Sequence, residues 1–208
     1  TVEEKMTLRK LPRNVWAVSL TSFFMDVSSE MVINILPLFL ANVLGVKTSL
    51  IGVIEGVAEA TASLLKLFSG WLSDKLGSRK WIAVAGYGIS AISKPFFLLT
   101  NTWASIAGAR WADRIGKGVR TAPRDALVAD SIDPKNRGLA FGFQRAADTA
   151  GAMLGLLIAI LVVWLVQKSA QTLNLNTFRT VVWISLIPAV LAVLSIAIGT
   201  KEVAIKGK

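Results

Sequence analysis

Twelve ionisable residues interrupt the long apolar stretches of this 208-residue chain, six acids and six bases. The acids are Asp26, Glu30, Glu55, Glu59, Asp113 and Asp148, and the bases are Lys66, Lys94, Arg110, Arg114, Lys117 and Arg145. A charged side chain that faces hydrocarbon at the centre of a membrane helix costs about 2.5–3.5 kcal/mol. We therefore expect these residues to face one another or a water-filled cavity, where they can bind protons and charged groups.

Three of the acids lie nearest the middle of their apolar stretches, namely Asp26, Glu30 and Asp113. A carboxylate that gains or loses an arginine neighbour changes its affinity for protons, so these three are candidates for proton coupling. Glu55 and Glu59 can take part in proton coupling or in binding a solute. Asp26 and Glu30, four residues apart, also suggest a site for a hard metal ion, which prefers oxygen ligands. Two carboxylates are few for a metal, and we expect no bound metal.

Arg110 and Arg114 are the best candidates for binding an anionic group. A guanidinium stays charged and grips a carboxylate or phosphate with two hydrogen bonds. At about 100° per residue, both share one helical stripe with Lys117 and Arg120. Lys117 is a further candidate for solute binding or coupling, and with Arg120 it is expected to tune gating near the cytoplasm.

The structural alternative for the same residues is a set of buried ion pairs between a basic helix and two acidic helices. Removing one partner of such a pair typically costs about 3–5 kcal/mol. We expect the partner of Arg114 to be Asp26 or Glu30, and we expect Arg145 and Asp148, three residues apart, to pair along one helix.

The composition is that of a membrane protein. Hydrophobic residues make up 53% of the chain and the mean hydropathy is +0.58, whereas soluble domains reach roughly 45–50% with glycine included. The net charge is +10, but the basic residues lie mostly at the ends of apolar stretches. This pattern indicates a lipid bilayer as partner and no nucleic acid. The chain has no Cys and no His, which excludes disulfides and thiolate or imidazole ligands.

Six stretches are long enough to cross a bilayer core of about 30 Å. They cover residues 14–44, 48–72, 81–99, 102–121, 139–166 and 180–199. The sequence therefore predicts an all-α integral membrane fold, a six-transmembrane-helix bundle over residues 14–199. Residues 1–13 are expected to form a cytoplasmic segment, and residues 200–208 the start of a cytoplasmic linker.

Basic residues favour one side of this expected bundle. Fourteen lie in the segments assigned to that side: Lys5, Arg9, Lys10, Arg13, Lys75, Arg79, Lys80, Arg120, Arg124, Lys135, Arg137, Lys201, Lys206 and Lys208. Three lie in the segments of the opposite side, namely Lys47, Lys168 and Arg179. Cytoplasmic loops carry an excess of Lys and Arg, so both termini are expected in the cytoplasm.

The segment between the second and third stretches combines glycines, an acid and a basic cluster. Its residues are Gly70, Asp74, Lys75, Gly77, Arg79 and Lys80. Glycine allows the tight turn that joins two membrane helices. The pattern Gly-x-Leu-x-Asp-Lys-x-Gly-x-Arg-Lys resembles the loop between helices 2 and 3 of the major facilitator superfamily. The resemblance implies a gating loop in which Asp74 acts as a conformational latch.

Two further segments carry this resemblance. Arg114-x-x-x-Gly118 resembles the superfamily's arginine motif, and residues 134–138 followed by Gly142 resemble the entry to helix 5. The resemblance implies the amino-terminal half of a facilitator fold, with three-plus-three inverted repeats. Gly52-x-x-x-Gly56 against Gly151-x-x-x-Gly155 is the one visible trace of the repeat.

The resemblance also implies a function. It predicts a secondary active transporter that moves a small-molecule substrate by alternating access, with proton coupling, as a symporter or antiporter. A second six-helix half is expected as partner, either as the rest of a longer protein or as another chain. Residues 26–31 and 113–126 resemble a bacterial branch, which implies the inner membrane.

The sequence leaves two alternative functions open. One is transport of a metal cation by the intramembrane carboxylates, and the other is a transport-inactive scaffold or receptor with the same fold. The chain has no His and no Gly-Lys-Ser/Thr phosphate loop. These patterns mark common catalytic and nucleotide sites, so we expect neither enzymatic activity nor a cofactor.

Overall fold

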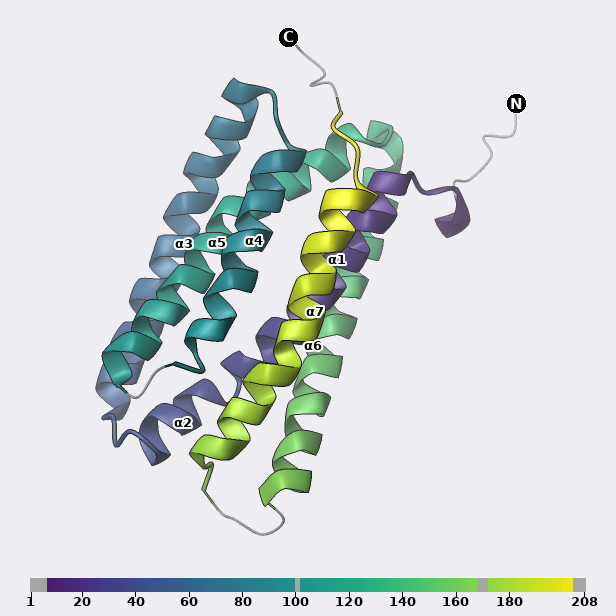
Figure 1. Ribbon diagram of the computed structural model, residues 1–208. Coiled ribbons are helices and arrows are strands. Elements are labelled where there is room, and N and C mark those ends of the chain that lie inside the picture. The colour runs from purple at the N-terminus through teal and green to yellow at the C-terminus, as the bar shows by residue number, and fades with distance from the viewer. Residues whose placement is uncertain (1–6, 100–101, 168–171, 204–208) are drawn as a thin grey trace, which may run out of the picture.

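The computed structural model describes residues 7–99, 102–167 and 172–203. Within these residues the chain is helical and contains no strand (Figure 1). The helices are α1 (Arg13–Ile33), α2 (Leu36–Asn42), α3 (Thr48–Leu76), α4 (Lys80–Phe96), α5 (Trp103–Asp130), α6 (Arg137–Gln167) and α7 (Leu175–Gly199), with short 3-10 turns at Leu8–Lys10 and Pro134–Asn136.

The helix bounds differ from the sequence prediction at several ends. The stretch 14–44 forms two helices, because the chain breaks at residues 34–35, just before Pro37. Proline lacks a backbone N–H and restricts the residue before it. The helix predicted for 102–121 continues to Asp130 with Pro123 inside it. α3 likewise runs on to Leu76 and ends at Gly77, whose φ of 68° is left-handed.

The remaining bounds shift by a few residues. α4 begins at Lys80 and ends at Phe96, earlier than the predicted residue 99. α6 covers Arg137–Gln167 instead of 139–166. α7 begins at Leu175 instead of 180, because Asn174 caps it by accepting a hydrogen bond from the backbone N–H of Thr177 at 2.8 Å. An asparagine at this position satisfies one of the free N–H groups of the first turn.

The helices pack in two groups of three, which contact each other. α1 packs along α6 and α7, while α5 packs along α3 and α4, and α4 meets α7 between the groups (Figure 1). α1, in the first span of the first three-helix repeat, therefore contacts α6 and α7, the second and third spans of the second repeat. α5, the first span of the second repeat, likewise contacts α3 and α4, the second and third spans of the first repeat. This exchange is the packing expected of a bundle with three-plus-three repeats.

Glycines allow the closest helix contacts of the bundle. A Cβ on Gly155 of α6 would lie 2.5 Å from the carbonyl oxygen of Val27 on α1, and a Cβ on Gly118 of α5 would lie 2.7 Å from that of Ala62 on α3. Gly52 and Gly56 differ, because a Cβ there would meet nothing within 4 Å. Gly52 and Gly56 therefore do not make the close helix contact that Gly151 and Gly155 make.

The outer surface of the bundle is apolar. Leu67, Ile187 and Ile198 are each more than 60% exposed, which fits a lipid-facing surface. By length and apolar composition, three helical segments of the described chain can cross a membrane: Arg13–Asn42, Pro134–Gln167 and Leu175–Gly199. α5 is rich in charged residues, but α3 and α4 cover it. Five of its charged residues are therefore buried, namely Arg110, Asp113, Arg114, Arg120 and Arg124.

Candidate functional site

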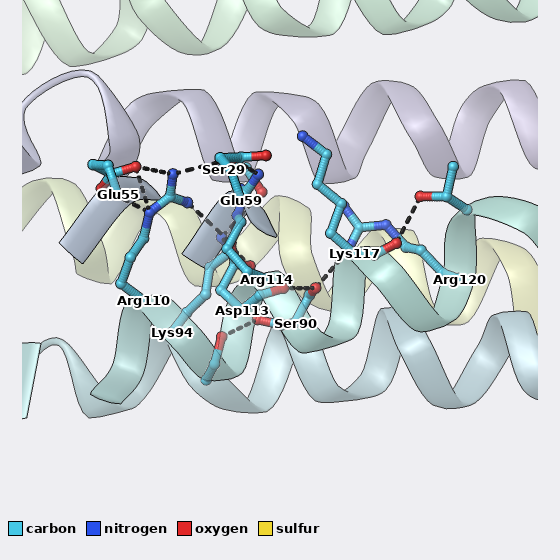
Figure 2. Close-up of polar contacts among 12 residues, drawn as sticks. Ser29, Glu55, Glu59, Ser90, Lys94, Arg110, Asp113, Arg114, Lys117 and Arg120 are labelled. Atoms are coloured by element: carbon cyan, nitrogen blue, oxygen red, sulfur yellow. Dashed lines mark hydrogen bonds and ion pairs between the residues drawn. The ribbon is translucent and has the colours of Figure 1, made fainter. Parts of the chain in front are cut away.

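Six of the predicted intramembrane charges form one group, which we call the ion-pair cluster. Its members are Glu55, Glu59, Lys94, Arg110, Asp113 and Arg114, drawn together in Figure 2. α3 supplies the two glutamates, α4 supplies the lysine and α5 supplies the other three. Three positive and three negative charges cancel, so the cluster is neutral as a whole.

Both arginines of the cluster are held by carboxylates. Arg110 donates from Nε to Oε1 of Glu55 at 2.9 Å. Arg114 donates from Nη1 to Oε1 of Glu59 at 2.9 Å and from Nη2 to Oδ2 of Asp113 at 2.9 Å. The predicted pairing of Arg114 with an α1 acid is therefore wrong, since its carboxylate partners come from α3 and from its own helix.

Lys94 joins the cluster to α1. Its side chain is only 2% exposed, and its Nζ lies 3.8 Å from Oδ1 of Asp113 and 3.2 Å from the hydroxyl oxygen of Ser29. Among the described residues, Oδ1 of Asp113 accepts no hydrogen bond and Nη1 of Arg110 donates none. The cluster thus binds four helices together and leaves two hydrogen-bonding positions open.

A separate group of predicted residues lines a polar cavity of about 380 Å³ between α1, α5 and α6. We call this space the polar cavity. Its lining consists of Asp26, Glu30, Lys117, Arg120, Thr121, Arg124, Arg145, Asp148, Thr149 and Ala152. In Figure 2 the Lys117 side chain extends away from the ribbon of α5, apart from the ion pairs of Arg110 and Arg114. Asp26, Glu30 and Lys117 therefore belong to a different site from the other five candidates.

Two arginines of the polar cavity already have carboxylate partners. Arg124 lies 2.9 Å from Oδ1 of Asp125 and donates to the Ser22 hydroxyl at 3.1 Å. Arg145 donates to Oδ2 of Asp148 at 3.2 Å, which is the pairing along one helix expected from their spacing. These contacts neutralise both guanidinium groups before any solute enters.

Four other charges of the cavity have no counterion among the described residues. Lys117 and Asp26 take part in no side-chain hydrogen bond or ion pair there, and the Glu30 carboxylate accepts only from its neighbour Asn34 at 3.0 Å. Arg120 donates to the Ser90 hydroxyl and lies 4.8 Å above the Tyr87 ring. The cavity therefore presents two unneutralised bases and two unneutralised acids.

The loop between α3 and α4, which the sequence predicts to be a gating loop, is organised around Arg79, which is buried. Its guanidinium pairs with Asp74, donates to Asp130 at 3.2 Å and donates to the Ser73 hydroxyl at 2.9 Å. Asp130 lies at the end of α5, beyond the helix end predicted from the sequence. Only the longer helix brings that carboxylate to the loop.

The other loop residues contribute to the turn and its surroundings. A Cβ on Gly70 would lie 3.2 Å from that of Ala122, so α3 and α5 approach closely there. Lys75 lies 4.9 Å above the ring of Trp71. Lys80 donates from Nζ to the carbonyl oxygen of Thr200 at 2.9 Å. The loop is thus attached to the segment that follows α7.

Glu202 is a loop contact that sequence reasoning did not identify. Its carboxylate accepts hydrogen bonds from the backbone N–H of Arg79 at 2.8 Å, from the backbone N–H of Lys80 at 3.1 Å and from the Ser78 hydroxyl at 3.1 Å. An acid beside the first turn of a helix is stabilised by the free N–H groups. No local pattern connects residues 123 positions apart, so only the fold reveals this contact.

The sequence matches the Major Facilitator Superfamily over residues 18–207. The chain therefore belongs to this superfamily of membrane transporters, and the all-helical bundle is its fold.

Individual relatives agree with this assignment. An uncharacterized MFS-type transporter of Methanocaldococcus jannaschii, MJ1317, is 41% identical over 161 residues, which cover 77% of this chain and 40% of the relative. The multidrug resistance protein MdtH of Cronobacter sakazakii is 29% identical over 130 residues, which cover 60% of this chain and 30% of the relative. The chain spans less than half the length of these relatives.

A solved structure supports the fold. A bacterial homologue of the human lysosomal transporter Spinster, in an inward-facing and occupied conformation, matches with a TM-score of 0.77 at 19% identity. The match covers 92% of this chain and 44% of that structure. At this identity the likeness concerns the fold alone.

Proposed function

We propose that this chain forms the amino-terminal half of a secondary active transporter that moves a small solute by alternating access, coupled to protons. The observation that carries this function is the polar cavity, where unneutralised acids and bases lie inside a bundle with an apolar outer surface. Intramembrane ionisable residues are expensive and mark solute or ion pathways. A bundle that served only as a scaffold would gain nothing from such charges.

Asp26 is the group best placed to carry the coupled proton. It lies on α1 in the polar cavity, with no hydrogen-bond donor among the described residues. Lys117 and Arg120 of α5 line the same cavity. A solute that engages these bases changes the electrostatic surroundings of Asp26 and so its affinity for a proton. Glu30, one helical turn further along, is the second candidate.

The ion-pair cluster has a different role in this scheme. Its three bases are matched by three acids, so Arg110 and Arg114 serve to hold α3 and α5 together. Glu59 remains half exposed, with 52% of its side chain accessible. The cluster therefore fixes the position of α5, which lines the polar cavity, and Glu59 is the member that is exposed enough to change partners.

The gating loop and the second half complete the transport cycle. Asp74 pairs with Arg79 but keeps 64% of its side chain exposed, so its carboxylate can also contact a second six-helix half. Formation and loss of that contact would favour different states of the transporter. Such a latch is the structural requirement of alternating access.

We propose that the protein lies in a bacterial inner membrane and that the end of the bundle with the α3–α4 loop faces the cytoplasm. The contacts of Arg79 with Asp130, and of Asn14 with Ser131 and the backbone of Lys201, put the α3–α4 loop, the end of α5 and both ends of the described chain together. Basic residues gather there, as the positive-inside rule requires for a cytoplasmic face. Four of the predicted basic residues, Lys5, Lys168, Lys206 and Lys208, lie outside the described residues.

The test is solute-driven proton movement in liposomes that contain the complete natural protein and an internal pH dye. Addition of a transported solute should change the internal pH, and Asp26→Asn should abolish that change. Asp26→Glu, which keeps a carboxylate, should retain part of it. A scaffold or receptor would give no solute-dependent signal with any member of a broad solute panel.

The metal-cation alternative receives less support. In the described part of the chain, no group of three or more acidic residues is arranged so that it could hold a metal ion. Hard cations usually take six or more oxygen ligands, and Asp26 with Glu30 supplies few of them. Divalent cations belong in the solute panel as the direct check.

A further inference from the structure

We infer that the polar cavity takes a small zwitterion, with its anionic group against Lys117 and Arg120 and its cationic group against Asp26, Glu30 and Asp148. The inference rests on the proposed transport function and adds the chemical class of the substrate. It depends on how the unneutralised charges are distributed over the cavity walls.

The two bases without a counterion lie on one helix. Lys117 and Arg120 are three residues apart on α5, so both project from the same side of that helix. Arg120 is held by Ser90 and Tyr87, neither of which supplies a negative charge. An ammonium and a guanidinium side by side form a site for a carboxylate or phosphate.

The acids lie on the two other helices that line the cavity. Asp26 and Glu30 are four residues apart on α1, and Asp148 lies on α6. Oδ1 of Asp148 is buried and accepts no hydrogen bond from any described residue, although Oδ2 is paired with Arg145. A buried acceptor without a donor is unfavourable. An ammonium group offers three donors for these oxygens.

A singly charged solute fits this cavity less well than a zwitterion. An anion would neutralise the α5 wall but would place its charge beside two unneutralised carboxylates. A cation would neutralise the acidic wall and face Lys117 and Arg120. Only a solute with both charges neutralises the two walls together, and a volume of about 380 Å³ accommodates a solute of amino-acid size.

The first measurement maps the charge of each wall without requiring a known substrate. The chain has no native cysteine, so Thr121→Cys on α5 and Ala152→Cys on α6 are specific probes in the complete natural protein after any other cysteine has been replaced. Each variant is treated with anionic and cationic methanethiosulfonate reagents. The anionic-to-cationic rate ratio should be at least several-fold higher at position 121 than at position 152.

Charge variants provide the control for this ratio. Lys117→Gln should lower the ratio at position 121, and Asp26→Asn should raise it at position 152. Lys47→Gln, at the other end of the bundle and exposed, should change neither. Equal ratios at the two positions would overturn the inference.

The second measurement tests the ligand class by protection against labelling. The probes are alanine, serine, leucine and phenylalanine at millimolar concentration, each with its N-acetyl derivative, which is an anion, and its amide, which is a cation. At least one free amino acid should slow labelling at position 121 more than either of its derivatives does. Equal or better protection by a derivative, or no protection by any amino acid, would overturn the inference.

The liposome assay separates this inference from the proposed function. If a singly charged solute drives proton movement, the transporter function stands and the zwitterion is excluded. If no solute of any charge drives proton movement, the proposed function itself fails.

Discussion

Glu202 caps α4, because its carboxylate accepts the backbone N–H of Arg79, the residue just before the helix, at 2.8 Å. The same Arg79 reaches with its side chain to Asp74 and Asp130. One residue thus connects the gating loop, the end of α5 and the segment after α7. A movement of that segment would therefore act directly on the loop.

Glu202→Ala should destabilise the protein by about 0.5–2 kcal/mol, the usual effect of losing a helix N-cap. The backbone N–H groups of Arg79 and Lys80 lose their acceptor when the carboxylate is removed. Thermal unfolding of the purified protein, followed by circular dichroism, measures the change. Glu202→Gln keeps one acceptor oxygen, so its unfolding midpoint should lie between those of the wild type and Glu202→Ala. An unchanged midpoint for Glu202→Ala would contradict the capping role.

Asp74→Asn should slow transport while leaving solute affinity within a few-fold of the wild type. The carboxylate pairs with Arg79 at the loop and lies on α3, a helix that contributes no residue to the lining of the polar cavity. Initial rates in liposomes give the turnover, and a binding titration gives the affinity. A large loss of affinity with a normal maximal rate would identify Asp74 as a solute ligand instead of a latch.

Arg114→Ala should destabilise the fold by about 3–5 kcal/mol, because it removes one of the bases that neutralise the buried Asp113 carboxylate. Arg114 is buried and holds the carboxylates of Asp113 and Glu59 at 2.9 Å. The double variant Arg114→Ala, Glu59→Ala should recover part of the loss. Unfolding midpoints of the two variants are compared.

Arg145→Ala serves as the matched control for this prediction. Its side chain is 60% exposed and pairs with Asp148 at 3.2 Å. Exposed ion pairs contribute about 0–1 kcal/mol, so its midpoint should change little. Similar losses for Arg114→Ala and Arg145→Ala would show that burial of the cluster is not what makes it stabilising.

Gly155→Ala should destabilise the bundle by about 1–3 kcal/mol, because extra atoms in a well-packed contact force the helices apart. The added Cβ would lie 2.5 Å from the carbonyl oxygen of Val27. Gly142→Ala on the same helix is the control, since a Cβ there meets nothing within 4 Å. Equal unfolding midpoints for the two variants would show that α1 and α6 do not pack closely at Gly155.

Cysteines at Ser78 and Lys47 test the orientation in the membrane. Ser78 lies at the loop between α3 and α4, and Lys47 precedes α3 at its other end. An impermeant thiol reagent added to intact cells should label position 47 and spare position 78. The reverse pattern would mean that the orientation proposed from the basic residues is inverted.

Sequence alone determined the features that depend on periodicity and on the bilayer. Apolar length predicts helices, and the cost of charge in hydrocarbon places Arg110 and Arg114 inside the bundle. The gating-loop pattern around Asp74 identifies the superfamily that the chain matches. Pro37 and Pro123 show the limit of this reasoning, because one proline follows a helix break while the other lies inside a continuous helix.

Only the tertiary structure decided which charges meet. Arg114 pairs with Glu59 rather than with an α1 acid, and Lys117, one turn further along α5, has no counterion among the described residues. The physical reason is that a helical period fixes the angle between residues on one helix, whereas contacts between helices depend on their separation and relative rotation. Backbone contacts such as that of Gly155 with Val27 set those two quantities. The resulting helix positions divide one predicted set of charges between the neutral ion-pair cluster and the charged polar cavity.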